Sequence, residues 1–87
     1  MSTGIRDFIT EIKMMEGERV SIKTTHKLYG GQKIETNFRI IDDASRLGFK
    51  INSQDIFIEK EGLINFGIID GTYYFASDLM HIELKTI

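Results

Sequence analysis

The chain has 87 residues, a formal net charge of −2 and no cysteine or proline. This length leaves room for one core, so we expect residues 1–87 to form a single domain. The lack of cysteine excludes disulfides, thiol nucleophiles and zinc–thiolate sites. The N-terminus has no basic start followed by an apolar run, and no segment approaches about 18 apolar residues. We therefore expect a cytoplasmic protein that does not enter a membrane.

The composition is uneven in two respects. Fifteen isoleucines stand against one valine, Val20. Because both residue types suit β-strands, packing does not explain this ratio, whereas an AT-rich genome does, and a bacterial or phage origin is expected. Residues 19–50 carry seven basic and three acidic side chains, and both flanking segments are acidic. This distribution predicts a basic side and an acidic side.

The N-terminal segment has the pattern of an amphipathic helix over about residues 3–15. Its apolar residues recur at the spacing i, i+3, i+4 and i+7: Ile5, Phe8, Ile9 and Ile12. Ser2 or Thr3 is suited to cap its start, and Gly17 is suited to end it in a left-handed conformation. We expect the apolar face of this helix to pack against a sheet formed by the rest of the chain.

After Gly17 the period changes from 3.6 to 2, which predicts an antiparallel β meander over about residues 18–86. Seven short segments alternate or are apolar: 18–27, 34–40, 47–51, 56–58, 63–69, 73–75 and 82–84. The segment 63–69 is apolar on both faces, so we expect an interior strand there. Residues 77–80 are expected to form one turn of helix.

Asp70-Gly71 is the strongest local signal in the chain. It separates Ile69 from Thr72, and both of its residues accept a positive φ, as a two-residue type I′ hairpin requires. The glycines within residues 28–32 predict a second hairpin loop.

These elements predict a mainly β (α+β) fold in which an N-terminal helix precedes a strongly curved antiparallel sheet or small barrel. The element order, which ends in strand, single turn and strand over residues 73–84, resembles the layout of Sm-like and other SH3-like small barrels. The resemblance implies a closed barrel and, for an Sm-like chain, RNA binding. The Sm pocket motifs have no counterpart here, so the resemblance assigns no binding residues.

Catalytic and ligand-binding motifs are missing from the sequence. His26 and His81 stand at predicted strand ends, outside any Ser-His-Asp arrangement. The carboxylates lack calcium-loop spacing, and Gly30-Gly31 and Gly71 belong to hairpins rather than to a phosphate-binding turn. We expect no enzymatic activity, no catalytic residue, no metal and no cofactor.

The basic segment around residues 19–50 is the candidate nucleic-acid surface. Lysines there are suited to meet phosphate, and an aromatic ring on a hairpin is suited to stack on a base. The candidate contacts are Lys23, Lys27, Tyr29, Lys33 and Arg39. Alternatively, the segment is a solvated hairpin whose lysines prevent edge-to-edge pairing.

An aromatic run, Tyr73-Tyr74-Phe75, leaves Tyr74 outside if its neighbours enter the core. A small core without disulfide or metal also favours self-association. Candidate protein-interface residues are Phe57, Leu63, Ile69 and Tyr74. We expect a homo-oligomeric protein-binding module that is a regulator, assembly part or inhibitor, with itself and an unidentified protein as partners. The alternative is an Sm-like nucleic-acid-binding protein.

Overall fold

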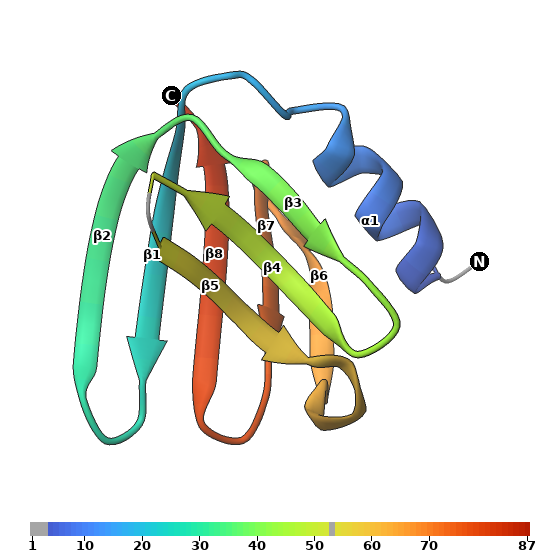
Figure 1. Ribbon diagram of the computed structural model, residues 1–87, viewed down its shortest axis with the longest axis vertical. Helices are drawn as coiled ribbons and strands as arrows, with labels where there is room; N and C mark the ends of the chain where they lie inside the picture. The colour runs from blue at the N-terminus through green and yellow to red at the C-terminus, as the bar shows by residue number, and fades with distance from the viewer. Residues whose placement is uncertain (1–3, 53) are drawn as a thin grey trace.

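The structure, a computed structural model, describes residues 4–52 and 54–87. This part of the chain is mainly β, with one N-terminal helix and eight strands packed into a compact unit (Figure 1). The elements in chain order are α1 (Ile5–Lys13), β1 (Val20–His26), β2 (Gly30–Thr36), β3 (Arg39–Asp42), β4 (Arg46–Ile51), β5 (Gln54–Glu59), the 3₁₀ turn η1 (Lys60–Gly62), β6 (Asn65–Ile69), β7 (Thr72–Ala76) and β8 (Met80–Thr86).

The strands are divided between two antiparallel sheets. A five-stranded sheet has the order β2-β1-β8-β7-β6, and a three-stranded sheet has the order β3-β4-β5. Figure 1 shows the smaller sheet crossing in front of the larger one, with α1 beside β3. Both sheets end in outer strands, so the antiparallel fold is confirmed whereas closure into a barrel is not.

The predicted strand over residues 34–40 is wrong, because the chain changes sheet in its middle. β2 ends before Asn37, and β3 begins after Phe38. The Asn37 side chain donates a hydrogen bond to the Gly17 carbonyl over 2.6 Å, and the buried Phe38 ring meets Phe49 edge-on at 5.2 Å. The alternation of apolar residues continues through this corner, so periodicity alone does not reveal it.

The core fills the space between the two sheets and α1. Phe75 on β7 lies at its centre, with its ring centroid 6.2 Å from that of Phe8 on α1 and 5.6 Å from that of Phe49 on β4. All three side chains are almost completely buried. One aromatic cluster therefore joins the helix to both sheets.

The predicted helix is confirmed, with Phe8, Ile9 and Ile12 buried on its apolar face. It ends at Lys13, and further turns lead to Gly17, which has a φ of +88°. The proposed caps, Ser2 and Thr3, lie outside the described residues.

The two predicted connections near the C-terminus have different outcomes. Asp70 and Gly71 have φ values of +51° and +78° between the paired residues Ile69 and Thr72, which confirms the two-residue turn. The helical turn expected at residues 77–80 is wrong. A reverse turn joins β7 to β8 there, closed by a 2.8 Å hydrogen bond from the Ser77 amide to the Met80 carbonyl.

We expect Gly71→Val to lower the free energy of unfolding by about 1–3 kcal/mol, because a β-branched residue is strained at a positive φ. A Cβ at this position meets no atom within 4 Å, so the loss is a pure backbone effect. Asp70→Asn is the matched control and should change stability by less than about 0.5 kcal/mol. Urea unfolding measures both changes, and equal small effects would contradict the turn.

Candidate functional site

β6 is an outer strand, so the interior position expected for residues 63–69 is wrong. α1 covers part of its inner face, where Phe66 packs against the Phe8 ring at 5.1 Å. This cover is incomplete. Ile64 and Ile68 remain 65% and 42% exposed on the face of Phe66, and Ile69 is 61% exposed on the opposite face.

The four outer strands of the two sheets differ in charge. Three of them carry two charged residues each. β2 has Lys33 and Glu35, β3 has Arg39 and Asp42, and β5 has Asp55 and Glu59. β6 has no charged residue. Charges on an outer strand discourage pairing with another chain, whereas an uncharged apolar edge favours the addition of a strand. β6 is therefore the least protected edge in the described part of the chain.

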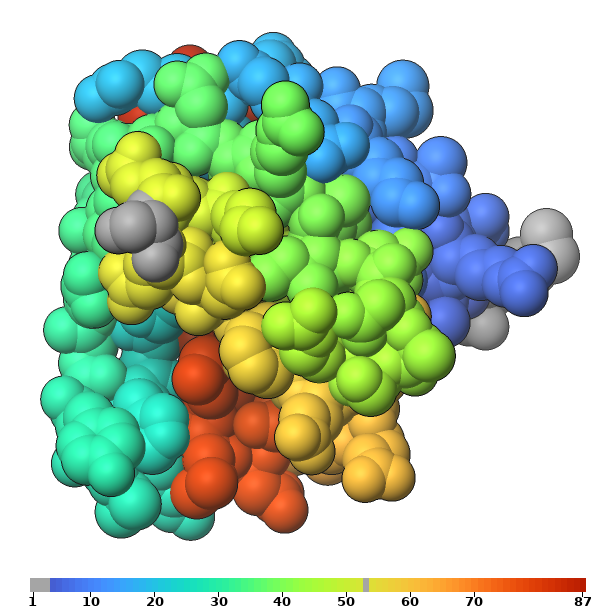
Figure 2. Space-filling view, in the orientation of Figure 1, coloured from blue at the N-terminus to red at the C-terminus, as the bar shows by residue number. Residues whose placement is uncertain are grey.

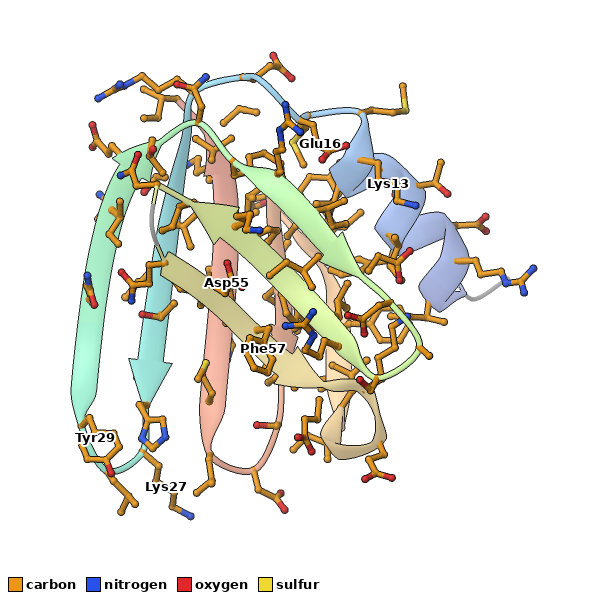
Figure 3. The ribbon with its side chains drawn as sticks, in the orientation of Figure 1. Lys13, Glu16, Lys27, Tyr29, Asp55 and Phe57 are labelled. Atoms are coloured by element: carbon orange, nitrogen blue, oxygen red, sulfur yellow. The ribbon has the colours of Figure 1, made fainter. Side chains whose placement is uncertain are left out.

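The four candidate interface residues do not form one surface. Ile69 and Tyr74 share the outer face of the five-stranded sheet, beside a hollow of about 320 Å³. Leu63 lies in a groove beside α1. Phe57 lies on β5 of the three-stranded sheet (Figure 3), where the Arg46 guanidinium carbon is 5.2 Å from its ring centroid.

Tyr74 does not project freely from the outer face. Its ring stacks on His81 with centroids 5.8 Å apart and planes tilted by 12°. The ring also covers Gly67, where a Cβ would lie 2.7 Å from the Tyr74 hydroxyl oxygen. This residue therefore contributes to the sheet surface rather than standing out as an anchor.

A groove of about 690 Å³ lies between α1, the end of β3, η1 and Phe66 of β6. Its apolar floor consists of Ile5, Ile9, Leu63 and Phe66, and its polar rim consists of Arg6, Thr10, Lys13, Asp42 and Lys60. Figure 1 shows α1 on the side of β6 that faces away from β7. The groove thus lies beside the helix, and the Phe66 side chain of β6 forms part of its wall.

Two lysines share one carboxylate at the groove rim. Lys60 Nζ lies 2.7 Å from Asp42 Oδ1, and Lys13 Nζ lies 3.3 Å from Asp42 Oδ2. The hydrogen bond from Lys60 lowers the pKa of Asp42, with Lys13 adding to the effect. Arg6 has no ion-pair partner within residues 4–52 and 54–87. The groove rim therefore carries three cations and one anion and is basic.

The candidate nucleic-acid residues lie in two places. Four belong to the β1–β2 hairpin, whereas Arg39 belongs to the other sheet, opposite Lys50. Lys23 and Lys33 stand directly opposite each other on the outer face, and Lys23 faces Glu83 on its other side. Basic and acidic side chains therefore alternate on this face.

Lys27 and Tyr29 occupy the tip of the same hairpin, which extends beyond the three-stranded sheet (Figures 2 and 3). Tyr29 is 85% exposed, and its ring lies 4.6 Å from that of His26. His26 Nδ1 accepts a hydrogen bond of 3.1 Å from the Leu28 amide. His26 thus stabilises the local turn, and the tyrosine face that points away from it is open.

A hollow of about 840 Å³ lies at the opposite end of the molecule from this tip. It is lined in part by Glu16, Gly17 and Asn37. Glu16 accepts a 2.9 Å hydrogen bond from the Ile40 amide, and Gly17 accepts the bond from Asn37. Because these groups already join the helix connection to the β2–β3 corner, the hollow is better explained as a structural seam.

Asp43 organises the β3–β4 turn. Its carboxylate accepts hydrogen bonds from the Ser45 amide at 2.9 Å, the Arg46 amide at 2.7 Å and Arg46 Nε at 2.8 Å. The Ser45 amide is the main cause that lowers the pKa of Asp43 from 3.8 to about 2. The turn therefore favours the ionised carboxylate.

We expect Asp43→Asn to destabilise the fold near neutral pH, and the difference from the wild type to shrink as the pH falls from about 4 to about 2. A carboxylate whose pKa is lowered in the folded state stabilises the fold at pH values above its pKa in the unfolded chain, and this stabilisation is lost when the carboxylate is protonated. Thermal melts from pH 6 to pH 2 measure it. Asp78→Asn is the control, since its carboxylate makes no hydrogen bond within the described residues. A pH-independent difference would contradict the assignment.

Among the described residues, no group of three or more histidine, aspartate or glutamate side chains is arranged to hold a metal ion. No helix in residues 4–52 and 54–87 is long and apolar enough to cross a membrane. Comparisons with protein-family models, curated proteins and solved structures find no match to this chain. The site is therefore interpreted from its geometry.

The sequence interpretation missed Ile64 and Ile68 on the edge and the Lys13–Asp42–Lys60 cluster. The uncharged, β-prone run of residues 63–69 is a signal for an open edge and could have indicated the first two. The cluster joins three elements distant in the sequence, so no local pattern identifies it.

Proposed function

We propose that this chain is a non-enzymatic protein-binding module and that the β6 edge is its binding surface. One observation carries the proposal: β6 is an outer strand without charge, with two exposed isoleucines in the strand and a third directly before it. A strand added to such an edge gains main-chain hydrogen bonds and buries apolar surface. By holding a strand of a larger bacterial or phage assembly, the module acts as a regulator, assembly part or inhibitor.

In the absence of another partner, two copies pair through β6 and form a homodimer. An antiparallel arrangement centred on Gly67 places Asn65 opposite Ile69 of the second copy and Phe66 opposite its Ile68. No like charges oppose one another in this register, because β6 has none. Such a contact is two-fold symmetric and therefore closes as a dimer.

Size-exclusion chromatography with light scattering over a range of micromolar concentrations tests the proposal. We expect a dimer for the wild type and a monomer for Ile68→Lys, because two lysines would meet near the two-fold axis. Ile87→Lys is the matched control, since Ile87 is 67% exposed far from this edge. A monomeric wild type, or equal effects of the two variants, would contradict self-association through β6.

An Sm-like nucleic-acid-binding protein, with the SH3-like relationship that this implies, is the alternative. Lys23 and Lys33 on one hairpin, with Lys27 and an exposed Tyr29 at its tip, favour it. Labelled single-stranded RNA tests it by fluorescence anisotropy at two salt concentrations. Salt-sensitive binding that is lost in Lys23→Gln/Lys33→Gln and retained in Ile68→Lys would favour the alternative.

A further inference from the structure

We propose that the groove between α1 and β6 selects an extended acidic peptide, which pairs with β6 and places an apolar side chain and a carboxylate into the groove two residues apart. This inference rests on the proposed binding of a strand at β6. It adds the chemistry of the partner, which the strand edge alone does not specify.

The side chains of a strand added to β6 have fixed directions. Successive residues of a strand point to opposite faces of the sheet, so alternate side chains of an added strand point the same way as Phe66. Phe66 faces α1 and lines the groove. Every second side chain of the bound strand therefore enters the space between the helix and the sheet.

The floor of the groove is apolar and partly uncovered. Ile9 is almost completely buried, whereas Ile5, Leu63 and Phe66 are only half-buried and have surface left to cover. A volume of about 690 Å³ falls within the range of about 300–1,000 Å³ found for ligand pockets. Side chains of leucine or valine size suit this floor.

The rim of the groove carries an excess of positive charge. Arg6, Lys13 and Lys60 line the rim with one carboxylate, Asp42, between the two lysines. Lys60 Nζ donates to Asp42 and also to the Asp43 carbonyl over 2.6 Å, whereas Lys13 reaches Asp42 only at 3.3 Å. A second carboxylate would complete the hydrogen bonding of Lys13 and would pair with Arg6. A second copy offers none on β6, so an acidic segment of another protein fits the groove better and displaces self-pairing.

Fluorescence anisotropy with synthetic peptides tests the inference on the whole chain. The probe is a labelled heptapeptide, Thr-Leu-Thr-Glu-Thr-Leu-Thr, in which leucine, glutamate and leucine share one face. We expect it to bind about 5- to 10-fold more tightly than the same peptide with a central glutamine, and a central lysine to weaken binding further. Raising the salt concentration should reduce the difference.

Two variants locate the charge effect. Lys13→Gln/Lys60→Gln should remove the preference for glutamate, and Lys13→Gln alone, at a half-exposed position, should reduce it without endangering the fold. Lys23→Gln/Lys33→Gln, on the outer face of the hairpin, should keep the full preference. Circular dichroism confirms that each variant is folded. A preference that survives in Lys13→Gln/Lys60→Gln would overturn the inference.

The remaining outcomes separate this inference from the proposed function. Equal binding of the three peptides, abolished by N-methylation of their backbone, would overturn the acidic preference and support strand addition at β6. No binding by any peptide would also overturn the inference, and the oligomeric state of Ile68→Lys would then decide the proposed function by itself.

Discussion

Replacing Phe8 by alanine is expected to lower the free energy of unfolding by about 3–5 kcal/mol, since it removes a large side chain that is 1% exposed. Phe8 is the aromatic residue of α1. Its ring meets three other aromatic rings: Phe66 at 5.1 Å, Tyr73 at 6.0 Å and Phe75 at 6.2 Å. The cavity would lie where the helix meets β6 and β7. The groove wall would then loosen together with the core.

Urea unfolding followed by circular dichroism measures this loss. Leu28→Ala is the control, because Leu28 is 71% exposed at a hairpin tip and should change stability by less than about 0.5 kcal/mol. If Phe8→Ala lost less than about 1 kcal/mol, the helix would not be part of the folding core.

Gly48→Ala is expected to destabilise the protein by about 3 kcal/mol or more, or to prevent folding. Gly48 is buried in the middle of β4 and pairs with Phe57 on β5. A Cβ at this position would collide with the Ile56 carbonyl oxygen and with the Phe57 backbone. These atoms belong to the neighbouring strand, so relief requires breaking the β4–β5 pairing.

Gly67→Ala provides a matched control for this prediction. Its Cβ would meet the Tyr74 hydroxyl at 2.7 Å, which is the far end of a side chain that can rotate away. We expect a loss of less than about 1 kcal/mol, partly offset because alanine loses less backbone entropy on folding than glycine. Similar losses for Gly48→Ala and Gly67→Ala, measured by thermal unfolding, would contradict the close approach of β4 and β5.

The parts of the fold that the sequence predicted correctly depend on local patterns. The apolar stripe of Phe8, Ile9 and Ile12 predicts one buried helix face, and Asp70-Gly71 predicts a turn with two positive φ values. Both signals act within a few residues, so no tertiary contact has to be known in advance.

The parts that the sequence did not predict depend on contacts between distant segments. Residues 34–40 keep a period of 2 although the chain changes sheet at Asn37, which is held by Gly17 from the helix connection. Residues 63–69 are apolar on both faces, but α1 covers one of these faces and leaves the edge open. An apolar pattern shows that a segment needs cover and does not identify what covers it.

The candidate site shows the same division. Ile69 and Tyr74 share a face because their strands form a short hairpin, whereas Phe57 and Leu63 lie elsewhere in the fold. The groove rim is assembled from α1, β3 and η1. Its basic character therefore emerges only after the chain has folded.

Two-dimensional ¹⁵N NMR spectra recorded from low to high micromolar protein concentration show which residues lie in the contact between two copies. If β6 is the binding edge, the amide resonances of residues 64–69 shift or broaden as the concentration rises, and Ile68→Lys removes the effect. The hairpin amides of residues 23–33 stay unchanged. Concentration-dependent changes confined to that hairpin, or a spectrum that is the same at every concentration, would contradict the account.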